Sequence, residues 1–356
     1  MTKVITTSTD NAVLIPISTE LLFKGRPGDL RIGEWVSIRK PTNKNEEDRK
    51  TNVFIFGCPD DTGVRLNRGR AGALEGPQEI RRSFYKMAVP MDRSWEPLHL
   101  IDCGDIEVSQ DITETHKEAF RASEELSSMG GTVVVLGGGH DFAAPGFLGF
   151  VQGRTKRTET ETFGLINVDP HLDVRELEGG RPNSGTSFRQ ILNSKAILGK
   201  NFIEFGCREN RNSQSHFEYC KEMGVNLQPL ESLRQTKPVV ELFKNYLARL
   251  SKQVDTVGLT IDMDSCADLT GTSAAQAIGF SLRELYEFAF WAGTHPRVKY
   301  FEIAEVAPCL DPSGKTALGA AEILYSFLCG KAHGSSSQYS PGLTNKNNKT
   351  LKNTKK

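Results

Sequence analysis

The stretch that decides the fold is TFGLINVDPHLDVR, residues 162–175. It begins as an apolar run typical of a buried strand and continues with Asp169, His171 and Asp173 at alternate positions. Successive side chains of an extended chain point to opposite faces, so these three residues share one side if the chain stays extended past the proline. The stretch therefore predicts a strand that ends on two carboxylates and an imidazole, with Arg175 on the same side.

Two other apolar runs end on residues of the same kind. Asp262 and Asp264 close the run DTVGLTIDMD, and His140 follows three glycines at the end of TVVVLGGGHD. Active sites of parallel sheets collect at the carboxyl ends of the strands. We therefore expect four carboxylates and two imidazoles to meet at one edge of a sheet.

Apolar runs alternate with amphipathic segments over most of the chain, which predicts a mainly parallel sheet covered on both faces. The fold class is α/β, with three α/β/α layers and a sheet of roughly eight strands. The expected strands are 52–58, 98–104, 132–138, 163–169, 201–207, 255–264 and 298–306, with a weaker one near 225–230. The expected helices are 75–87, 111–131, 239–252, 281–293 and 316–328.

The chain divides into three parts. Residues 1–50 look irregular, and no linker interrupts 52–330, so 51–333 is expected to form a single catalytic domain. Residues 334–356 are polar, basic and free of acids. This composition predicts a disordered tail, or alternatively a basic interaction tail.

The composition excludes several classes of protein. The 44 basic residues balance the 44 acidic ones among 356, so no electrostatic argument supports a nucleic-acid or membrane surface. No apolar run approaches the roughly 20 residues of a membrane span, and the N-terminus lacks a convincing signal peptide. Seven scattered cysteines without a C-x-x-C pair are typical of reduced core residues, so we expect a cytoplasmic protein.

Six ligand-type side chains suit two divalent cations. Carboxylate-rich shells with some imidazole favour Mn²⁺, with Zn²⁺, Fe²⁺, Co²⁺ and Ni²⁺ as alternatives. Four carboxylates in one cleft repel one another, and two cations would remove that repulsion. Each motif alone has another interpretation: D-x-H-x-D as a solvated loop, D-x-D as a turn, and GGGH as a tight connection. Their coincidence at three strand ends favours a metal centre.

Four motifs together carry a family resemblance. GGGHD (137–141), NVDPHLDVR (167–175), TIDMD (260–264) and EIAEVAPCLD (302–311) resemble the arginase, agmatinase and formimidoylglutamase superfamily, the ureohydrolases, over roughly 50–330. The resemblance implies the arginase–deacetylase fold, two Mn²⁺ ions with a bridging hydroxide, and a possible homo-oligomer. It implies that Glu305 holds the substrate's amidine nitrogens and that Asp173 passes a proton to the departing amine. The implied metal ligands are His140, Asp169, His171, Asp173, Asp262 and Asp264.

Within this superfamily the chain is most similar to formimidoylglutamase. Arginases carry a histidine where RPNSGTSFRQI (181–191) has Ser184 before Gly185. NRGRAGALEGPQEIRRS (67–83) and GGGH in place of GGDH point to the same branch. The resemblance implies hydrolysis of N-formimidoyl-L-glutamate to L-glutamate and formamide, a step of histidine degradation, by attack of the bridging hydroxide on the formimidoyl carbon.

The chemistry of this substrate independently favours that branch. Formimidoylglutamate carries two carboxylates, which call for fixed cations such as Arg175 and Arg189. A structural salt bridge is the alternative for either arginine. Asn183 and Ser184 are candidates to hydrogen-bond substrate, or else to cap their own loop.

The loop after Asp264 departs from the family pattern. It reads SCADLTGTSAAQAIGF (265–280), shorter than usual and without the Pro-Gly pair. Agmatine, a guanidino acid or arginine therefore stay as alternative substrates. A catalytically silent relative with a binding role is a second alternative. A mononuclear zinc deacetylase fits less well, because it does not need the complete ligand set.

Overall fold

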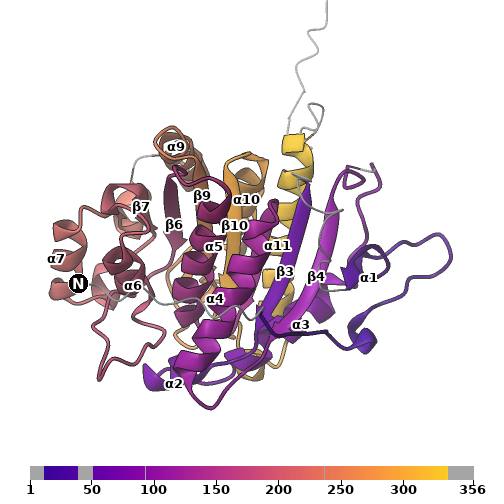
Figure 1. Ribbon diagram of the computed structural model, residues 1–356, viewed down its shortest axis with the longest axis horizontal. Helices are drawn as coiled ribbons and strands as arrows, with labels where there is room; N and C mark the ends of the chain where they lie inside the picture. Colours follow the sequence, from indigo (N-terminus) through magenta and orange to yellow (C-terminus); the bar gives the residue numbers. More distant parts are fainter. Residues whose placement is uncertain (1–11, 39–50, 93, 236, 336–356) are drawn as a thin grey trace, which may run out of the picture.

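A largely parallel sheet lies between two layers of helices in the computed structural model, which describes residues 12–38, 51–92, 94–235 and 237–335 (Figure 1). The described residues form ten strands in the order β1-β4-β3-β5-β10-β9-β6-β7-β8, with β2 also pairing with β4. Only β1 is antiparallel to its neighbour. The strands are β1 (Leu14–Ile15), β2 (Ser37–Ile38), β3 (Asn52–Cys58), β4 (His99–Ile106), β5 (Thr132–Gly137), β6 (Phe163–Val168), β7 (Phe202–Phe205), β8 (Asn226–Gln228), β9 (Thr256–Asp262) and β10 (Val298–Ala304).

The predicted α/β class with three layers is confirmed, and each of the eight expected strands is present. The sheet is larger than expected because β1 and β2 extend it beyond β4. Both belong to the segment 1–50, expected to be irregular, of which the structure describes 12–38. A two-residue strand carries too short a pattern for its periodicity to be recognised.

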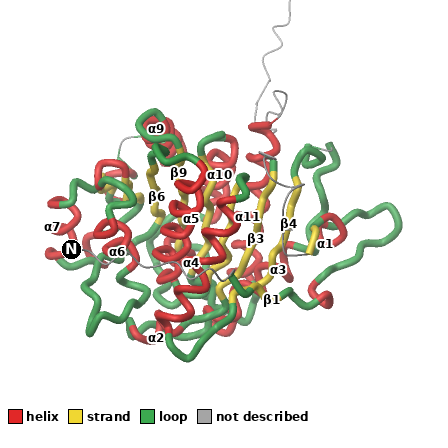
Figure 2. Tube along the Cα trace, in the orientation of Figure 1, coloured by secondary structure: helices red, strands yellow, loops and turns green. Residues whose placement is uncertain are grey.

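The helices lie on both faces of the sheet (Figure 2). Each of the five predicted helices is present, and the Ser281–Glu284 capping box begins α10 as expected. Of the expected tail, 334–356, the first two residues still belong to the helix Lys315–Ser335, and residues 336–356 lie outside the described residues. The helices are α1 (Ile32–Trp35), α2 (Thr62–Leu66), α3 (Gly76–Phe84), α4 (Ile112–Ser128), α5 (Ala143–Arg157), α6 (Ser187–Ser194), α7 (Gln214–Glu222), α8 (Leu230–Leu233), α9 (Val239–Ser251), α10 (Leu282–Thr294) and α11 (Lys315–Ser335).

Alternate residues of the central strands supply two separate cores. One core joins the sheet to α3, α9, α10 and α11, and the other joins it to α4, α5 and α6. Helix α5 was not predicted, because glycines break its apolar pattern. A Cβ on Gly149 would lie 2.1 Å from the Phe120 carbonyl oxygen of α4, so glycine is what permits this close packing.

The sheet order places four strands side by side at its centre, β5-β10-β9-β6. All four are parallel, so their carboxyl ends lie at one edge. The chain segments that leave these ends carry every one of the predicted metal ligands and Glu305.

A buried ion-pair cluster joins α3 to β4, which lies outside the four central strands. Arg81 is 1% exposed; its Nε lies 2.7 Å from Asp102 Oδ2 and one of its terminal nitrogens lies 2.6 Å from Asp105 Oδ1. The Tyr85 hydroxyl donates to Asp102 as well, and the Gly104 carbonyl accepts from Arg81. The pKa of Arg81 lies well above its ordinary value because Asp102 and Asp105 outweigh the effect of burial. The guanidinium therefore stays charged, and the cluster needs both signs present.

We predict that Arg81→Ala lowers the free energy of unfolding by about 3–5 kcal/mol, because Asp102 would be left buried without its cation. Arg82 is the matched control on the same helix, since its half-exposed side chain pairs with Glu79 alone among the described residues. Arg82→Ala should cost no more than about 1 kcal/mol. Urea unfolding of both variants measures this, and equal losses would contradict the assignment.

Candidate metal centre

Three connections bring the six predicted ligands together. His140 begins the 3₁₀ turn His140–Phe142 after β5, and Asp169, His171 and Asp173 follow the last residue of β6. Asp262 ends β9, and Asp264 lies in the 3₁₀ turn Met263–Ser265. The segments are far apart in sequence and adjacent in the sheet, so the topology itself gathers the ligands.

The expectation that the chain stays extended through Asp173 is wrong. Strand β6 stops at Val168, and Asp173 has a φ of +43°, a left-handed conformation that a turn requires. The Asp169 carboxylate accepts a hydrogen bond of 2.7 Å from the His171 N–H and so stabilises the turn. Leu172 and Val174 are nevertheless buried, so the alternation of inside and outside persists in a bent chain.

Asp262 and Asp264 also converge through a turn. Asp262 Oδ1 accepts a hydrogen bond of 2.8 Å from the Asp264 N–H. A carboxylate that hydrogen-bonds the backbone two residues on holds an Asx turn. Asp262 thus uses Oδ1 for its turn and keeps Oδ2 for the site, whereas Asp169 Oδ1 both closes its turn and faces His171.

The first ligand group surrounds His140. Its Nδ1 lies 3.0 Å from Asp169 Oδ2, 3.2 Å from Asp173 Oδ2 and 3.2 Å from Asp262 Oδ2. The four ligand atoms all lie within 4.8 Å of one another. Ligands about 2.1 Å from one octahedral ion are about 3 Å apart, which is the spacing seen here.

The second ligand group shares Asp169 with the first. His171 Nδ1 lies 3.4 Å from Asp169 Oδ1 and 3.4 Å from Asp264 Oδ2. These three ligand atoms again lie within 4.8 Å of one another. The two oxygens of Asp169 point to different groups, which suits a carboxylate that bridges two cations.

The donor set fits divalent cations. Both ring nitrogens of His140 and Asp264 Oδ1 are buried without a hydrogen-bond partner. Buried polar atoms of this kind are costly unless a partner satisfies them. A cation in the first ligand group would satisfy His140 Nδ1, the ring nitrogen that faces the three carboxylates.

The ionisation of these side chains leads to the same conclusion. Burial and Asp169 raise the pKa of Asp173 to about 6, and burial and Asp262 raise the pKa of Asp264 well above its ordinary value. Burial lowers the pKa of His171, but Asp169 outweighs it, and the pKa rises to about 9. The chain alone holds protons among its crowded carboxylates, and metal binding would release them.

A polar network that the sequence did not predict supports Asp169 from inside the sheet. The Thr260 hydroxyl donates to Asn167 Oδ1 at 2.7 Å, and Asn167 Nδ2 donates to Glu204 at 2.9 Å. Asn167 Nδ2 also lies 3.5 Å from Asp169 Oδ2. Burial raises the pKa of Glu204 well above its ordinary value. The only sequence signal was Asn167 two positions before Asp169.

Glu305 lies beside the first ligand group. Its Oε1 accepts a hydrogen bond of 3.0 Å from the His140 N–H, and its own N–H donates to the Gly138 carbonyl at 2.9 Å. Its φ of +65° is rare for a side-chain-bearing residue and is typical of functional sites. Burial and Asp262 raise its pKa to about 8.

The S-G-T loop lies next to this centre. Ser184 accepts a hydrogen bond of 3.0 Å from Asn67 Nδ2, and the Asn183 side chain accepts one of 3.0 Å from the Gly185 N–H. Both side chains therefore hold their own loop, which is the alternative to a hydrogen bond with substrate that the sequence left open. A Cβ on Gly185 would lie 2.7 Å from Arg175 Cδ, so the exposed Arg175 side chain passes directly over this glycine.

Arg189 is more constrained than Arg175. Its Nε donates to the Val174 carbonyl at 2.6 Å, and its guanidinium lies 3.9 Å from the Tyr219 ring centroid. Burial, together with Arg175 and Arg189, lowers the pKa of His216 on α7. The three basic side chains therefore lie close enough to interact.

Comparison with known proteins identifies relatives of this arrangement. The profile of the arginase family matches residues 51–330. Formimidoylglutamase of Staphylococcus epidermidis is 32% identical over 307 residues, which cover 85% of this chain and 94% of the relative. Formimidoylglutamase of Clostridium tetani is 29% identical over 83% of this chain and 88% of its own.

Solved structures agree with the sequence relatives. The crystal structure of Trypanosoma cruzi formiminoglutamase with Mn²⁺₂ has a TM-score of 0.73 at 28% identity, covering 85% of this chain and 99% of that chain. Formimidoylglutamase of Bacillus subtilis has a TM-score of 0.74 at 26% identity, and the match covers 87% of this chain and 94% of that chain. Among the described residues of this chain, no helix has the length and apolar composition needed to cross a membrane.

The two ligand groups predict which variant loses which cation. His140→Asn should retain about one Mn²⁺ per chain, and so should Asp264→Asn, because each removes a ligand of one group. Asp169→Asn should retain almost none, since Asp169 belongs to both groups.

Elemental analysis after loading with Mn²⁺ and desalting measures the content. Asp268→Asn is the matched control, because this exposed carboxylate four residues after Asp264 caps the Leu282 N–H instead. It should retain two ions, as the unsubstituted chain should. Equal losses in His140→Asn and Asp169→Asn would contradict a shared ligand.

Proposed function

The chain belongs to the arginase family, whose members are metallohydrolases of linear amidines, and from this premise we propose that it hydrolyses N-formimidoyl-L-glutamate to L-glutamate and formamide. The main observation in favour of this substrate is the exposed guanidinium of Arg175, which lies over Gly185 of the S-G-T loop. A substrate with two carboxylates has a use for such a cation, whereas arginine and agmatine carry cationic ends of their own.

The metal pair supports hydrolysis. The six ligands form two groups that share Asp169, and a relative of known structure contains Mn²⁺₂. When bound, two such ions activate a water as the nucleophile and balance the charge of the surrounding carboxylates. The metal we propose is Mn²⁺.

Glu305 is the residue that we assign to the amidine. Its carboxylate is buried and fixed by the His140 N–H, so it is held rigidly beside the first ligand group. A carboxylate in that position pairs with the N–H donors of an amidinium and orients its carbon toward the nucleophile.

Asp173 is the residue that we assign to proton transfer. Its side chain is 11% exposed, whereas those of Asp169 and Asp262 are 0% and 3% exposed. It is therefore the most accessible carboxylate of its group, and a departing amine can approach it. General acid–base transfer needs a heavy-atom distance of about 2.6–3.2 Å, which the bound substrate would provide.

Arg175 and Arg189 are assigned to the substrate carboxylates. Arg175 is exposed, and its N–H rather than its guanidinium makes the backbone bond to the Gly185 carbonyl. Arg189 donates its Nε to a carbonyl and keeps its terminal nitrogens near the weakly paired Glu176, at 3.9 Å. Asn183 and Ser184, which hold the loop, would add hydrogen bonds at its surface.

The substrate panel tests this proposal directly. Protein loaded with Mn²⁺ should release formamide from formimidoylglutamate at least about 100-fold more efficiently than it releases urea from arginine, agmatine or a guanidino acid. These competitors lack one or both of the carboxylates, and each lost hydrogen bond to a charged group costs about 1.5–3 kcal/mol. Release of urea without formamide would replace the proposal with another ureohydrolase activity. No turnover by the fully loaded protein would favour a silent relative.

Two substitutions test the arginine without touching a ligand. Arg175→Ala should lower kcat/KM for formimidoylglutamate by about 10- to 100-fold, the effect of losing a hydrogen bond to a charged group. Gly185→Ala should act in the same direction, because its Cβ would displace Arg175.

Both variants should keep two Mn²⁺ ions. Arg283→Ala is the control, an exposed arginine that pairs with Glu287 on α10. Unchanged kinetics in Arg175→Ala would mean that the substrate carboxylates bind elsewhere.

A further inference from the structure

Three arginines from three different parts of the chain donate hydrogen bonds to carbonyls of the loop 265–280. Arg70 donates to the Thr272 carbonyl at 2.7 Å and to the Ser273 carbonyl at 3.1 Å. Arg208 donates to the Ile278 carbonyl at 3.1 Å, and Arg234 donates to the Gly279 carbonyl at 3.0 Å. This is the loop whose sequence departs from the family pattern.

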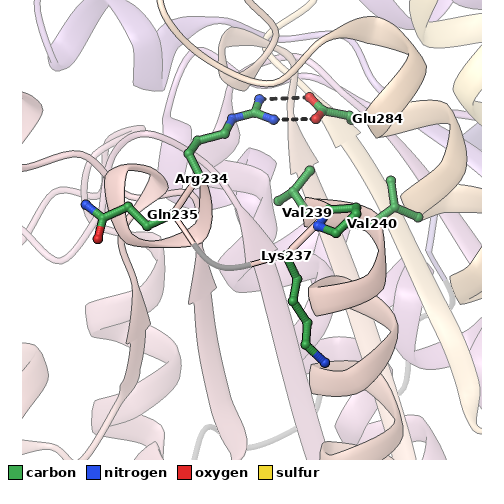
Figure 3. A pocket seen from close by; sticks show the side chains of 7 residues that line it. Arg234, Gln235, Lys237, Val239, Val240 and Glu284 are labelled. Carbon is green, nitrogen blue, oxygen red and sulfur yellow. Dashed lines mark hydrogen bonds and ion pairs between the residues drawn. The ribbon is translucent and has the colours of Figure 1, made fainter.

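Arg70 differs from the other two arginines in its remaining partners. Arg234 pairs with both carboxylate oxygens of Glu284 (Figure 3), and Arg208 pairs with Glu231 at 3.1 Å. Among the described residues, the hydrogen bonds of the Arg70 guanidinium all go to the loop. Its planar fork matches two successive carbonyls, a geometry that a lysine cannot reproduce.

The segment that carries Arg70 is held firmly on the other side. The Gly69 N–H donates to the Val64 carbonyl at 2.8 Å, and the Gly72 N–H donates to Asp61 at 2.6 Å. Arg68, the residue before Gly69, has a φ of +64°, which the surrounding bonds must enforce. Arg70 therefore reaches the loop from a rigid base.

The carbonyls that Arg70 binds belong to residues next to Glu305. The Ser273 side chain lies close enough to Glu305 to lower its pKa, against the larger effects of burial and Asp262. The preceding Gly271 accepts a hydrogen bond of 2.7 Å from the Ala307 N–H and donates one of 3.0 Å to Thr316. The loop thus runs along the segment that follows Glu305, and Arg70 binds the two residues that come directly after Gly271.

We propose that Arg70 is a positioning residue for substrate specificity, which holds Ser273 against Glu305 and thereby sets how the amidine end of the substrate is seated. The proposal rests on the assignment of the amidine to Glu305. The Nε and one terminal nitrogen of Arg70 donate hydrogen bonds to backbone carbonyls of the loop. Arg70 therefore acts through the loop and not on the substrate directly.

A double-mutant cycle tests the coupling. Arg70→Ala and Ser273→Ala should each lower kcat/KM by about 10-fold, and the double variant should lose at most about 2-fold more than the worse single variant, because both changes remove one interaction. Arg70→Lys should recover only part of the loss. All variants should keep two Mn²⁺ ions, and the substrate used is whichever compound of the panel the unsubstituted protein hydrolyses.

Arg234→Ala is the matched arm of the cycle, since it removes the same kind of bond at the other end of the loop. Its effect should multiply with that of Ser273→Ala. The assignment to Arg70 is wrong if Arg234→Ala couples to Ser273→Ala as strongly as Arg70→Ala does. It is also wrong if the fold-losses in kcat/KM of Arg70→Ala and Ser273→Ala simply multiply in the double variant. Unchanged kcat/KM in Arg70→Ala overturns it as well.

Hydrogen exchange supplies a measurement that needs no turnover, and so separates this proposal from the substrate assignment. Arg70→Ala should speed amide exchange at residues 273–275 by about 10-fold or more and leave the strands unchanged. Arg234→Ala should act at 278–280 instead. Equal exchange at 273–275 in Arg70→Ala and the unsubstituted protein would show that Arg70 does not hold the loop.

Discussion

Mutual repulsion among four carboxylates in one buried volume is the constraint on which the rest of this structure depends. Asp169, Asp173, Asp262 and Asp264 lie at the ends of β6 and β9, which are adjacent and parallel. Such a cluster costs stability unless cations neutralise it. The sheet, its two apolar cores and the Arg81 cluster provide the rigid frame that holds the ligands together despite that cost.

The frame reaches the site through strained turns and not through extended strands. Asp173 and Glu305 both adopt positive φ, and the Asp169 and Asp262 carboxylates each close a turn by accepting a backbone N–H. A conformation of this kind costs of order 1–3 kcal/mol and persists only where its surroundings enforce it. Glu305 shows how: its N–H and its carboxylate bind the Gly138–His140 segment at both ends.

The sequence predicted what depends on strand order and missed what depends on turns. Parallel strands with polar ends were enough to bring His140, Asp169 and Asp262 together, because topology does not need the local backbone to be known. The left-handed Asp173 could not be predicted, since a D-x-H-x-D pattern reads equally well as an extended chain. Asn167 and Glu204 were missed for another reason: a single buried polar residue inside a strand carries no periodicity.

The arginines show the limit of residue type as a guide to role. Arg81, Arg175 and Arg70 have the same side chain, and their acceptors alone separate them: buried carboxylates for Arg81, loop carbonyls for Arg70. Arg175 lies over a glycine with its guanidinium exposed. A guanidinium already committed to the protein stabilises a position, whereas an uncommitted one beside a metal centre is available to an anionic substrate. Which arginine belongs to which group is decided by tertiary contacts, and these contacts are what a sequence pattern does not contain.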